Sequence, residues 1–494
     1  MSEKQGVGSS ILPLATYKKM LIIVIFNMFK NILYNLIWTL RKIPRKTYNK
    51  NAFKNTQGLR NPNNFNISNS FKVKITVLLL LVACSQNESF FSDVSNPEVN
   101  QINIGDNYVC NEWLGSDNYE RCLEGSEITL LANFDQKLNN IIEYREEIYL
   151  LQANGVIFKN TKDNIFIDIT EKVSSVKDST TAEIGLYGIS FHPVENYFLV
   201  SYSNLLNELT IEKYLLDADG SVVMQNSEII FKQKNDWCCH FAGSVIWSDY
   251  FQDFLISVGD MDEDAPITRE PLITTSNKGK ILFLTKNISK TKLIGINSNL
   301  DSKKNILAYG LRNPWKISVY SNFLFITDVG AVDQEELNLV DLDSFQSRNN
   351  DPYLFGWPIY EGNKTRKAED FEYSEISLWT ESKSLDAIEY VNQNSIVPTL
   401  YYSHDAPENY RAAIIGGAVI DNEASKHFEH YIFADYLSKE LFSYNFKSDE
   451  LFLVPLPTEF SSQITSLAIN PNEQDSVLIA TTNGELYQVR LPNF

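Results

Sequence analysis

Six segments of the chain share one pattern: an alternating strand, a short turn with Asp, Asn or Pro, and a second strand that ends in small or polar residues. They are residues 138–159, 185–203, 241–260, 312–330, 416–436 and 464–489. Period-2 alternation broken by turn residues is typical of antiparallel hairpins. Six four-stranded units around an axis can bury both faces of each hairpin. We therefore predict an all-β fold, a six-bladed β-propeller with four-stranded blades, over residues 126–494.

The alternative to a propeller is a β-sandwich with fortuitous similarity between its strand pairs. The shared endings of the second strands, such as "SYS", "VGD" and "ADY", favour blades whose turns gather on one face. Residues 204–240 and 331–410 are expected to be loops on a face of the disc, and such loops would form a cleft.

Charge is distributed unevenly along the 494 residues, whose net charge is −19. Residues 1–83 carry thirteen basic residues and one acidic residue, a net charge of +12, and the remainder carries thirty basic and sixty-one acidic residues, a net charge of −31. Such an acidic body disfavours nucleic acid and anionic lipid and suits neutral ligands or bound cations.

The N-terminal region contains two apolar runs. Residues 20–40 are apolar enough to span a bilayer, although Lys30 and three Asn residues interrupt them. Residues 75–84, "ITVLLLLVAC", have the length of a signal-peptide core, and their end resembles a bacterial lipobox. We therefore expect residues 1–83 to be an extension plus a lipoprotein signal peptide and residues 84–125 to be an acidic tether. This interpretation predicts a membrane-anchored lipoprotein of the cell envelope, periplasmic or surface-facing, with its lipid on Cys84; the alternative is a chance match.

The five cysteines are consistent with export. Lipidation of Cys84 would leave Cys110, Cys122, Cys238 and Cys239, an even set suited to an oxidising compartment. A Cys110–Cys122 disulfide is expected. The adjacent Cys238 and Cys239 form either a strained vicinal disulfide or two unpaired buried thiols.

Nine stretches between residues 126 and 490 are collinear with one known family. They include "EIGLYGISFHP" (183–193), "HFAGSVIW" (240–247), "AYGLRNPWKIS" (308–318), "ITDVGAVDQEELNLV" (326–340) and "FGWPIYEGN" (355–363). At these stretches the chain resembles the glucose/sorbosone dehydrogenase family, six-bladed propellers whose enzymatic members use pyrroloquinoline quinone (PQQ) and calcium. The resemblance implies a small-molecule sugar substrate and an electron acceptor as partners.

The resemblance also implies roles for individual residues. His240 falls on the family's general base, and Asp260 falls on its acidic partner. Arg312 and Asn313 fall on the pair that touches the cofactor and the substrate. Glu183 occupies the cofactor-edge position.

A sixth residue, Lys439, lies near the cationic position that faces the cofactor's carboxylates. The chain also departs from the family pattern. Ala242-Gly243 stands in place of the usual Gly-Gly, "MDEDAPITREP" (261–271) replaces a Gly- and Asn-rich stretch, and no second cation is visible near residues 416–420.

Oxidation of a sugar hydroxyl needs a base for the O–H proton and an acceptor for the hydride on the same carbon. No protein side chain accepts hydride, so a quinone is required. Neutral His240 suits the proton removal, Asp260 would hold its tautomer, and Arg312 would stabilise developing negative charge. Calcium would polarise the quinone carbonyl, but the sequence does not identify its ligands.

Other functions are compatible with the same residues. His240 could be a buried polar residue that bonds a carbonyl near the axis. The fold also occurs in non-catalytic members such as the Hedgehog-interacting proteins, which would make this chain a binder of carbohydrate or a protein partner at the envelope. A lactone hydrolase would need carboxylates stacked around calcium at the axis, for which Asp260, Asp328 and Asp435 are candidates, whereas "LRNPW" (311–315) favours a dehydrogenase.

Overall fold

The computed structural model describes residues 126–174, 183–262, 270–284, 305–366, 387–404, 410–457, 460–473 and 475–492, together with the backbone of two short strands near residues 101 and 121. These residues belong to one compact unit, Val94–Phe494. The predictions for residues 1–83, for Cys84 and for a Cys110–Cys122 disulfide lie outside the described side chains. No helix within the described ranges is long and apolar enough to cross a bilayer.

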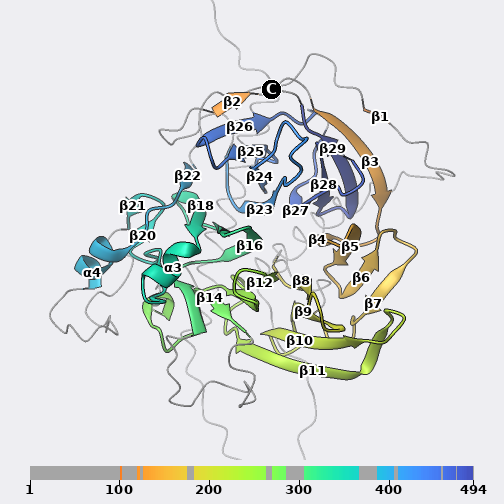
Figure 1. The fold of residues 1–494 in the computed structure, drawn as a ribbon, viewed down its shortest axis with the longest axis horizontal. Helices are drawn as coiled ribbons and strands as arrows, with labels where there is room; N and C mark the ends of the chain where they lie inside the picture. The colour runs from red at the N-terminus through yellow and green to blue at the C-terminus, as the bar shows by residue number, and fades with distance from the viewer. Residues whose placement is uncertain are drawn as a thin grey trace, which may run out of the picture. The chain divides into compact units, whose positions relative to one another are not determined.

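Antiparallel sheets are arranged as six blades around an axis, which confirms the predicted all-β six-bladed propeller (Figure 1). Blade 1 consists of β4 (Leu138–Tyr144), β5 (Glu147–Gln152), β6 (Val156–Lys159) and β7 (Ile165–Asp168). Blade 2 consists of β8 (Leu186–Phe191), β9 (Tyr197–Ser203), β10 (Glu208–Leu216) and β11 (Val222–Lys234). Blade 3 consists of β12 (Ala242–Ser248), β13 (Asp253–Val258), β14 (Lys280–Phe283) and β15 (Ile306–Tyr309).

The remaining blades repeat this order. Blade 4 consists of β16 (Pro314–Tyr320), β17 (Phe323–Asp328), β18 (Gln334–Asp341) and β22 (Leu400–Ser403). Blade 5 consists of β23 (Ile414–Val419), β24 (His430–Asp435), β25 (Leu441–Asn445) and β26 (Glu450–Val454). Blade 6 consists of β27 (Ile464–Ile469), β28 (Ser476–Thr481), β29 (Glu485–Arg490) and β3 (Glu127–Asn133).

Blade 6 closes the ring by combining both ends of the described chain. Its outer strand β3 comes from the N-terminal side and pairs antiparallel with β29, so the first and last parts of the propeller share one sheet. Two short segments extend the edges: β1 (Gln101–Ile102) pairs with β3, and β2 (Glu120–Cys122) pairs in parallel with β26. This shared sheet joins the two ends of the propeller and closes the ring.

The prediction that residues 204–240 and 331–410 are loops is largely wrong, because the outer strands of blades 2 and 4 lie there. Residues 204–240 contain β10 and β11. The second interval contains β18, β22, the short strands β19 (Tyr353–Leu354), β20 (Tyr360–Glu361) and β21 (Lys364–Thr365), and the helices α3 (Asp343–Ser347) and α4 (Ala387–Asn394). β11 exposes much of its surface, so it lacks the apolar alternation that marks the inner strands.

The six inner strands β4, β8, β12, β16, β23 and β27 contact one another in this order, and β27 contacts β4. Their first residues lie level: the amides of Asn139 and Asn140 donate to the carbonyls of Leu186 and Tyr187, and Thr465 donates to the carbonyl of Leu138. We call the end of the ring at which the inner strands begin the start face. Side chains that precede the inner strands therefore meet on this face.

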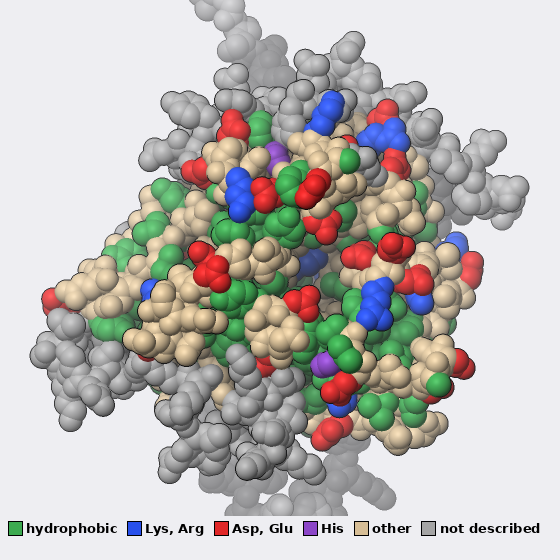
Figure 2. Space-filling model, in the orientation of Figure 1, with side chains coloured by type: hydrophobic (Ala, Val, Ile, Leu, Met, Phe, Trp, Pro, Cys, Tyr) green, Lys and Arg blue, Asp and Glu red, His purple; other side chains and the backbone are tan. Residues whose placement is uncertain are grey.

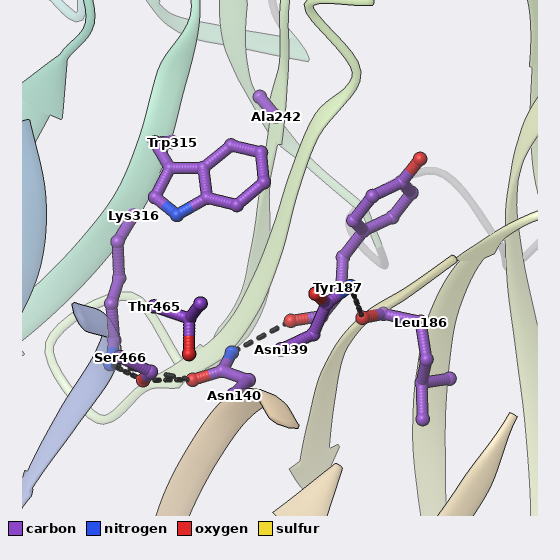
Figure 3. Close-up of a pocket in the computed structure, with 9 residues that line it drawn as sticks. All are labelled: Asn139, Asn140, Leu186, Tyr187, Ala242, Trp315, Lys316, Thr465 and Ser466. Atoms are coloured by element: carbon purple, nitrogen blue, oxygen red, sulfur yellow. Dashed lines mark hydrogen bonds between the residues drawn. The ribbon is translucent and has the colours of Figure 1, made fainter. Parts of the chain in front are cut away.

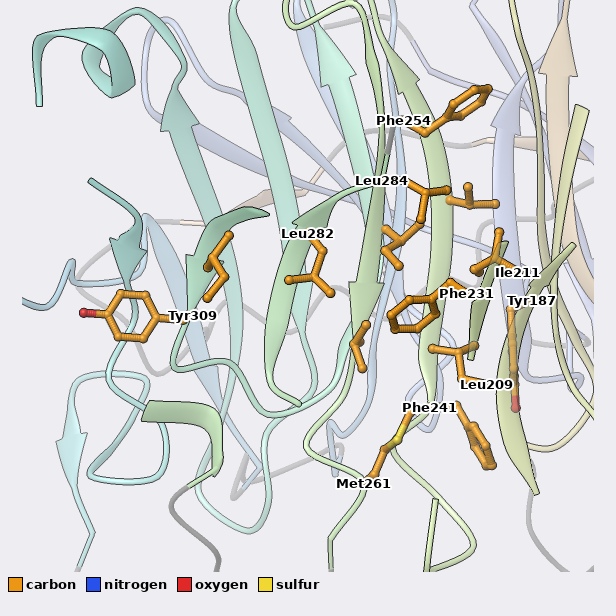
Figure 4. Packing of buried hydrophobic residues seen from close by; sticks show 14 of the residues in the cluster. Tyr187, Leu209, Ile211, Phe231, Phe241, Phe254, Met261, Leu282, Leu284 and Tyr309 are labelled. Carbon is orange, nitrogen blue, oxygen red and sulfur yellow. The ribbon is translucent and has the colours of Figure 1, made fainter. Parts of the chain in front are cut away.

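Each inner strand has a register shift against its neighbour near its beginning. Such bulges bend a strand and re-aim its side chains. Between neighbouring blades, apolar side chains fill the space, as Figure 4 shows for Leu209, Phe231, Phe241, Phe254 and Leu282 of blades 2 and 3. This packing fixes the positions of the inner strands and of the side chains that precede them.

Candidate active site

His240 lies on the start face, two residues before β12, and is 5% exposed. Its backbone has φ 57°, and Ala242 has φ 55°, both in the left-handed region that L-residues rarely adopt. Gly259, after β13, lies against the carbonyl of His240, where a side chain would collide with the backbone. The "HFAG" and "VGD" stretches therefore hold the histidine in a conformation that a regular strand would not give.

The two ring nitrogens of His240 have different partners. Nδ1 lies 2.7 Å from Oδ1 of Asp260, and Nε2 lies 2.9 Å from Nη2 of Arg312. A guanidinium donates hydrogen bonds and cannot accept them, so Nε2 is the acceptor and the ring proton is on Nδ1, donated to Asp260. The histidine is thus held as a neutral imidazole whose Nε2 lone pair accepts the hydrogen bond from Arg312.

Asp260 is itself oriented by a second donor. Trp357 Nε1 donates to Asp260 Oδ2 at 2.9 Å. The backbone N–H of Asp260 donates to the carbonyl of Arg312 at 2.7 Å. The ring of Trp237 meets the edge of His240 with centroids 4.8 Å apart. The carboxylate, the imidazole and the two indoles therefore form one packed group, of which sequence reasoning assigned only His240 and Asp260 to the site.

Arg312 precedes β16 as His240 precedes β12. Its Nη1 donates to the carbonyl of Val329 at 2.9 Å, and its Cζ lies 5.6 Å from the Trp357 ring centroid. Its backbone N–H donates to the carboxylate of Asp328. The guanidinium is buried beside His240, where it can stabilise negative charge that develops on a bound oxygen.

Asn313 and Glu183 join blades 2, 3 and 4. The amide of Asn313 accepts from the backbone N–H of Ala242 at 3.1 Å and lies 3.5 Å from Glu183 Oε1. Glu183 Oε2 accepts the backbone N–H of His240. The structure thus brings together five of the six predicted site residues: His240, Asp260, Arg312, Asn313 and Glu183.

The sixth predicted site residue, Lys439, lies in the turn between β24 and β25. The backbone N–H of Lys439 donates to the carbonyl of Asp435. This turn is on the start face, but Lys439 does not take part in the hydrogen bonds around His240.

Lys137, which directly precedes β4, is a cation that sequence reasoning missed. Burial lowers the pKa of Lys137 from 10.5 to about 8, and the neighbouring Glu183 opposes this shift. Its position before an inner strand was the available signal.

A small cavity lies in the ring below these residues (Figure 3). Its volume is about 10 Å³, and Asn140, Tyr187, Ala242, Trp315 and Lys316 are among the side chains that line it. This is about the space that one water molecule needs. Ala242, which stands in place of the family's usual glycine, is among the residues on its wall.

Cys238 and Cys239 are free thiols, so the vicinal disulfide considered from sequence is not formed, and the alternative of two unpaired thiols is correct. Their sulfur atoms are in contact. Burial raises the pKa of the Cys239 thiol well above its ordinary value, and Cys238 and the negative charge of Glu183 add to this effect. The thiol beside His240 is therefore held protonated.

Buried carboxylates lie beneath Arg312. Burial and the neighbouring Glu336 raise the pKa of Asp328 well above its ordinary range, and burial raises the pKa of Glu336 to about 7. Within the described ranges, no group of three His, Cys, Asp or Glu side chains is arranged to hold a metal ion. The candidates for a lactone-hydrolase site have other partners: Asp260 bonds His240, Asp328 bonds backbone N–H groups, and Asp435 accepts from Tyr402.

The fold and the site define a six-bladed propeller with a carboxylate-supported histidine and an arginine at one mouth of its axis. The sequence profile of the family described as "Glucose / Sorbosone dehydrogenase" matches residues 151–426, more than half of the chain. The chain belongs to the glucose/sorbosone dehydrogenase family.

Solved structures of similar fold include two sugar dehydrogenases. The PQQ-bound aldose sugar dehydrogenase of Streptomyces coelicolor is 14% identical, with a TM-score of 0.50 over 74% of this chain and 98% of that one. The apo soluble aldose sugar dehydrogenase of Escherichia coli is 16% identical, with a TM-score of 0.51 over 74% of this chain and 99% of that one. At these identities the likeness shows the fold. The HIPL2 protein of Arabidopsis thaliana is 28% identical over 160 residues, which span 31% of this chain and 20% of that protein.

Proposed function

We propose that the protein is a quinoprotein dehydrogenase that oxidises a hydroxyl of an aldose-type sugar or related alcohol with PQQ, with His240 as the general base. The observation that carries this proposal is the tautomer of His240, since a base must present an unprotonated nitrogen toward its substrate. Membership of the glucose/sorbosone dehydrogenase family supports it. The likeness to aldose sugar dehydrogenases points to a sugar as substrate class.

In this proposal His240 Nε2 accepts the proton of the substrate hydroxyl. Asp260 already accepts from Nδ1, so its negative charge stabilises the imidazolium that forms. Arg312, which holds Nε2 in the resting protein, turns its donors to the substrate oxygen as negative charge develops there. Trp357 keeps Asp260 oriented and covers one face of the arginine.

The charged groups of the start face fit PQQ, which carries three carboxylates. Lys137 and Lys439, from two different blades, would hold these carboxylates, Arg312 would lie between the cofactor and the substrate oxygen, and Asn313 and Glu183 would bond the polar edge of the ring system. Bound PQQ would supply the hydride acceptor that no side chain provides. Calcium would be bound by backbone oxygens together with the cofactor, since hard cations accept carbonyl ligands.

Export to the cell envelope and a lipid anchor at Cys84 belong to the same proposal. The apolar run before Cys84 supports them, and so does the even number of cysteines that remain. A surface location would let electrons pass from the reduced cofactor to a separate acceptor at the membrane.

The test is turnover by the purified protein reconstituted with PQQ and Ca²⁺, measured with a panel of aldoses and an artificial electron acceptor. Wild type is expected to reduce the acceptor, and His240→Ala is expected to lose at least about a thousandfold in kcat. His192→Gln is the matched control, because His192 caps the β8–β9 turn through its own Nδ1 and should leave turnover unchanged. Sugar binding without turnover in wild type would instead favour the non-catalytic propeller.

A further inference from the structure

A second and much larger cavity lies at the other end of the axis. Its volume is about 490 Å³. The inner strands of blades 1, 3, 4, 5 and 6 line it with the second halves of their sequences, away from the start face. Its apolar wall includes the partly exposed Ile142, Ile246 and Ile469, whereas Ile141 and Ile317, which also line it, are buried between the blades. We call this cavity the apolar cup.

Lys316 separates the apolar cup from the small cavity below the candidate active site, since it lines both cavities. Its ammonium donates to the carbonyl of Leu467 at 2.9 Å, to Ser466 Oγ at 3.1 Å and toward Asn140 Oδ1 at 3.5 Å. The stem of Lys316 lies against Gly416, where a Cβ would stand 2.6 Å from that of the lysine. The three N–H donors of Lys316 are therefore used within the ring and are not available to an occupant of the cup.

The charges at the mouth of the apolar cup are negative. Glu143, Glu146 and Asp421 line the cup, and all three are exposed. Arg145, which stands between the two glutamates in sequence, directs its guanidinium to the carbonyl of Pro193. The space-filling view along the axis shows a hollow at the centre of the ring with acidic side chains around it (Figure 2).

We propose that the apolar cup is a second ligand site, which binds a small organic cation with an apolar body. The apolar body would lie against the isoleucine wall, and the ammonium would stay at the mouth beside Glu143, Glu146 and Asp421. A cavity of this volume lies within the range of small-molecule sites, and an apolar pocket with a few charged groups at one end fixes the orientation of such a ligand. The acidic mouth would repel carboxylates and phosphates, so fatty acids and sugar phosphates are excluded as occupants.

The site is independent of the proposed dehydrogenase activity, because Lys316 and its hydrogen bonds lie between the two cavities. Its binding can therefore be measured without PQQ, sugar or turnover. Failure of the proposed function would not affect this measurement, and failure of this binding would not affect turnover.

The experiment titrates the full chain with 3-phenylpropylammonium, with uncharged 3-phenylpropanol as the comparison, by calorimetry at low ionic strength. The ammonium is expected to bind, and the alcohol is expected to bind roughly tenfold more weakly, because two or three unit charges lie near the mouth. The double variant Glu143→Gln/Asp421→Asn is expected to weaken ammonium binding by roughly tenfold and to leave alcohol binding unchanged.

The matched control is Asp163→Asn/Glu195→Gln, which removes two exposed charges that do not line the apolar cup. It should bind the ammonium as wild type does. Ala418→Trp, which would fill the cup, should abolish binding of both probes. The proposal is overturned if the ammonium does not bind, if the alcohol binds equally well, or if the control pair weakens binding as much as the mouth pair.

Discussion

Lys316→Met should change how the stability of the propeller depends on pH. Burial lowers the pKa of Lys316 from 10.5 to about 7, so the folded protein releases this proton in a range where the unfolded chain keeps it. Between pH 7 and pH 10.5 the unfolded state binds more protons at Lys316 than the folded state does. The free energy of unfolding therefore rises with pH across this range. The contribution of Lys316 to stability therefore increases from pH 7 upward.

The size of this effect follows from the two pKa values. At pH 6 both states hold the proton, whereas pH 9 lies two units above the folded pKa and still below the unfolded one. One unit corresponds to about 1.4 kcal/mol, so Lys316 contributes about 3 kcal/mol to the increase in unfolding free energy between pH 6 and pH 9. Methionine has a similar length and no charge, so the variant should lack this increment.

The assay is urea unfolding at pH 6 and pH 9, followed by tryptophan fluorescence, for wild type and for Lys316→Met. Lys162→Met, which removes an exposed lysine, is the control and should keep the wild-type difference. Other groups also titrate in this range, but they are the same in all three proteins and cancel in the comparison. An unchanged difference in Lys316→Met would refute the buried ammonium as the source of the pH dependence.

Three other changes test the site and its surroundings. Asp260→Asn should lower kcat by about 100- to 10,000-fold, because an amide does not hold the Nδ1–H tautomer or stabilise the imidazolium; steady-state kinetics would contradict this if kcat stayed within threefold. Iodoacetamide at pH 8 should label Cys239 in urea but barely in the native protein, since its pKa is raised; rapid native labelling by mass spectrometry would count against this environment. Glu335→Gln should destabilise by about 3 kcal/mol near pH 5.5. The hydrogen bond from His404 contributes to the lowered pKa of Glu335, and the stability that this carboxylate contributes is lost as pH falls below 4.5. Glu335 in turn raises the pKa of His404, and the stability that the imidazolium contributes is lost as pH rises above 6.5. A loss of melting temperature in Glu335→Gln that did not shrink toward pH 8.5 would contradict this account.

The inner strands could be predicted from sequence because each belongs to a hairpin in which apolar and polar residues alternate clearly. The outer strand β11 could not, since polar residues occupy most of it. The closing strand β3 was also not identified, because its pairing with β29 joins residues more than 350 positions apart and leaves no local pattern.

The candidate site was predicted from the resemblance to the glucose/sorbosone dehydrogenase family, whose matching motifs stand next to strand boundaries. His240 and Arg312 precede inner strands, and Asp260 follows β13. The Trp357 bond to Asp260 and the charge of Lys137 beside Glu183 were not predictable, because they depend on which blades become neighbours. Contacts between blades are set by ring closure and not by local sequence.

The central claim is that Nε2 of His240 is unprotonated and accepts from Arg312 while Nδ1–H is donated to Asp260. Nitrogen-15 NMR of histidine-labelled protein near pH 8 measures this directly, with His240→Gln used to assign the signal. The account predicts a neutral ring with its proton on Nδ1, and loss of that tautomer in Asp260→Asn. A proton on Nε2 in the wild-type protein would contradict it.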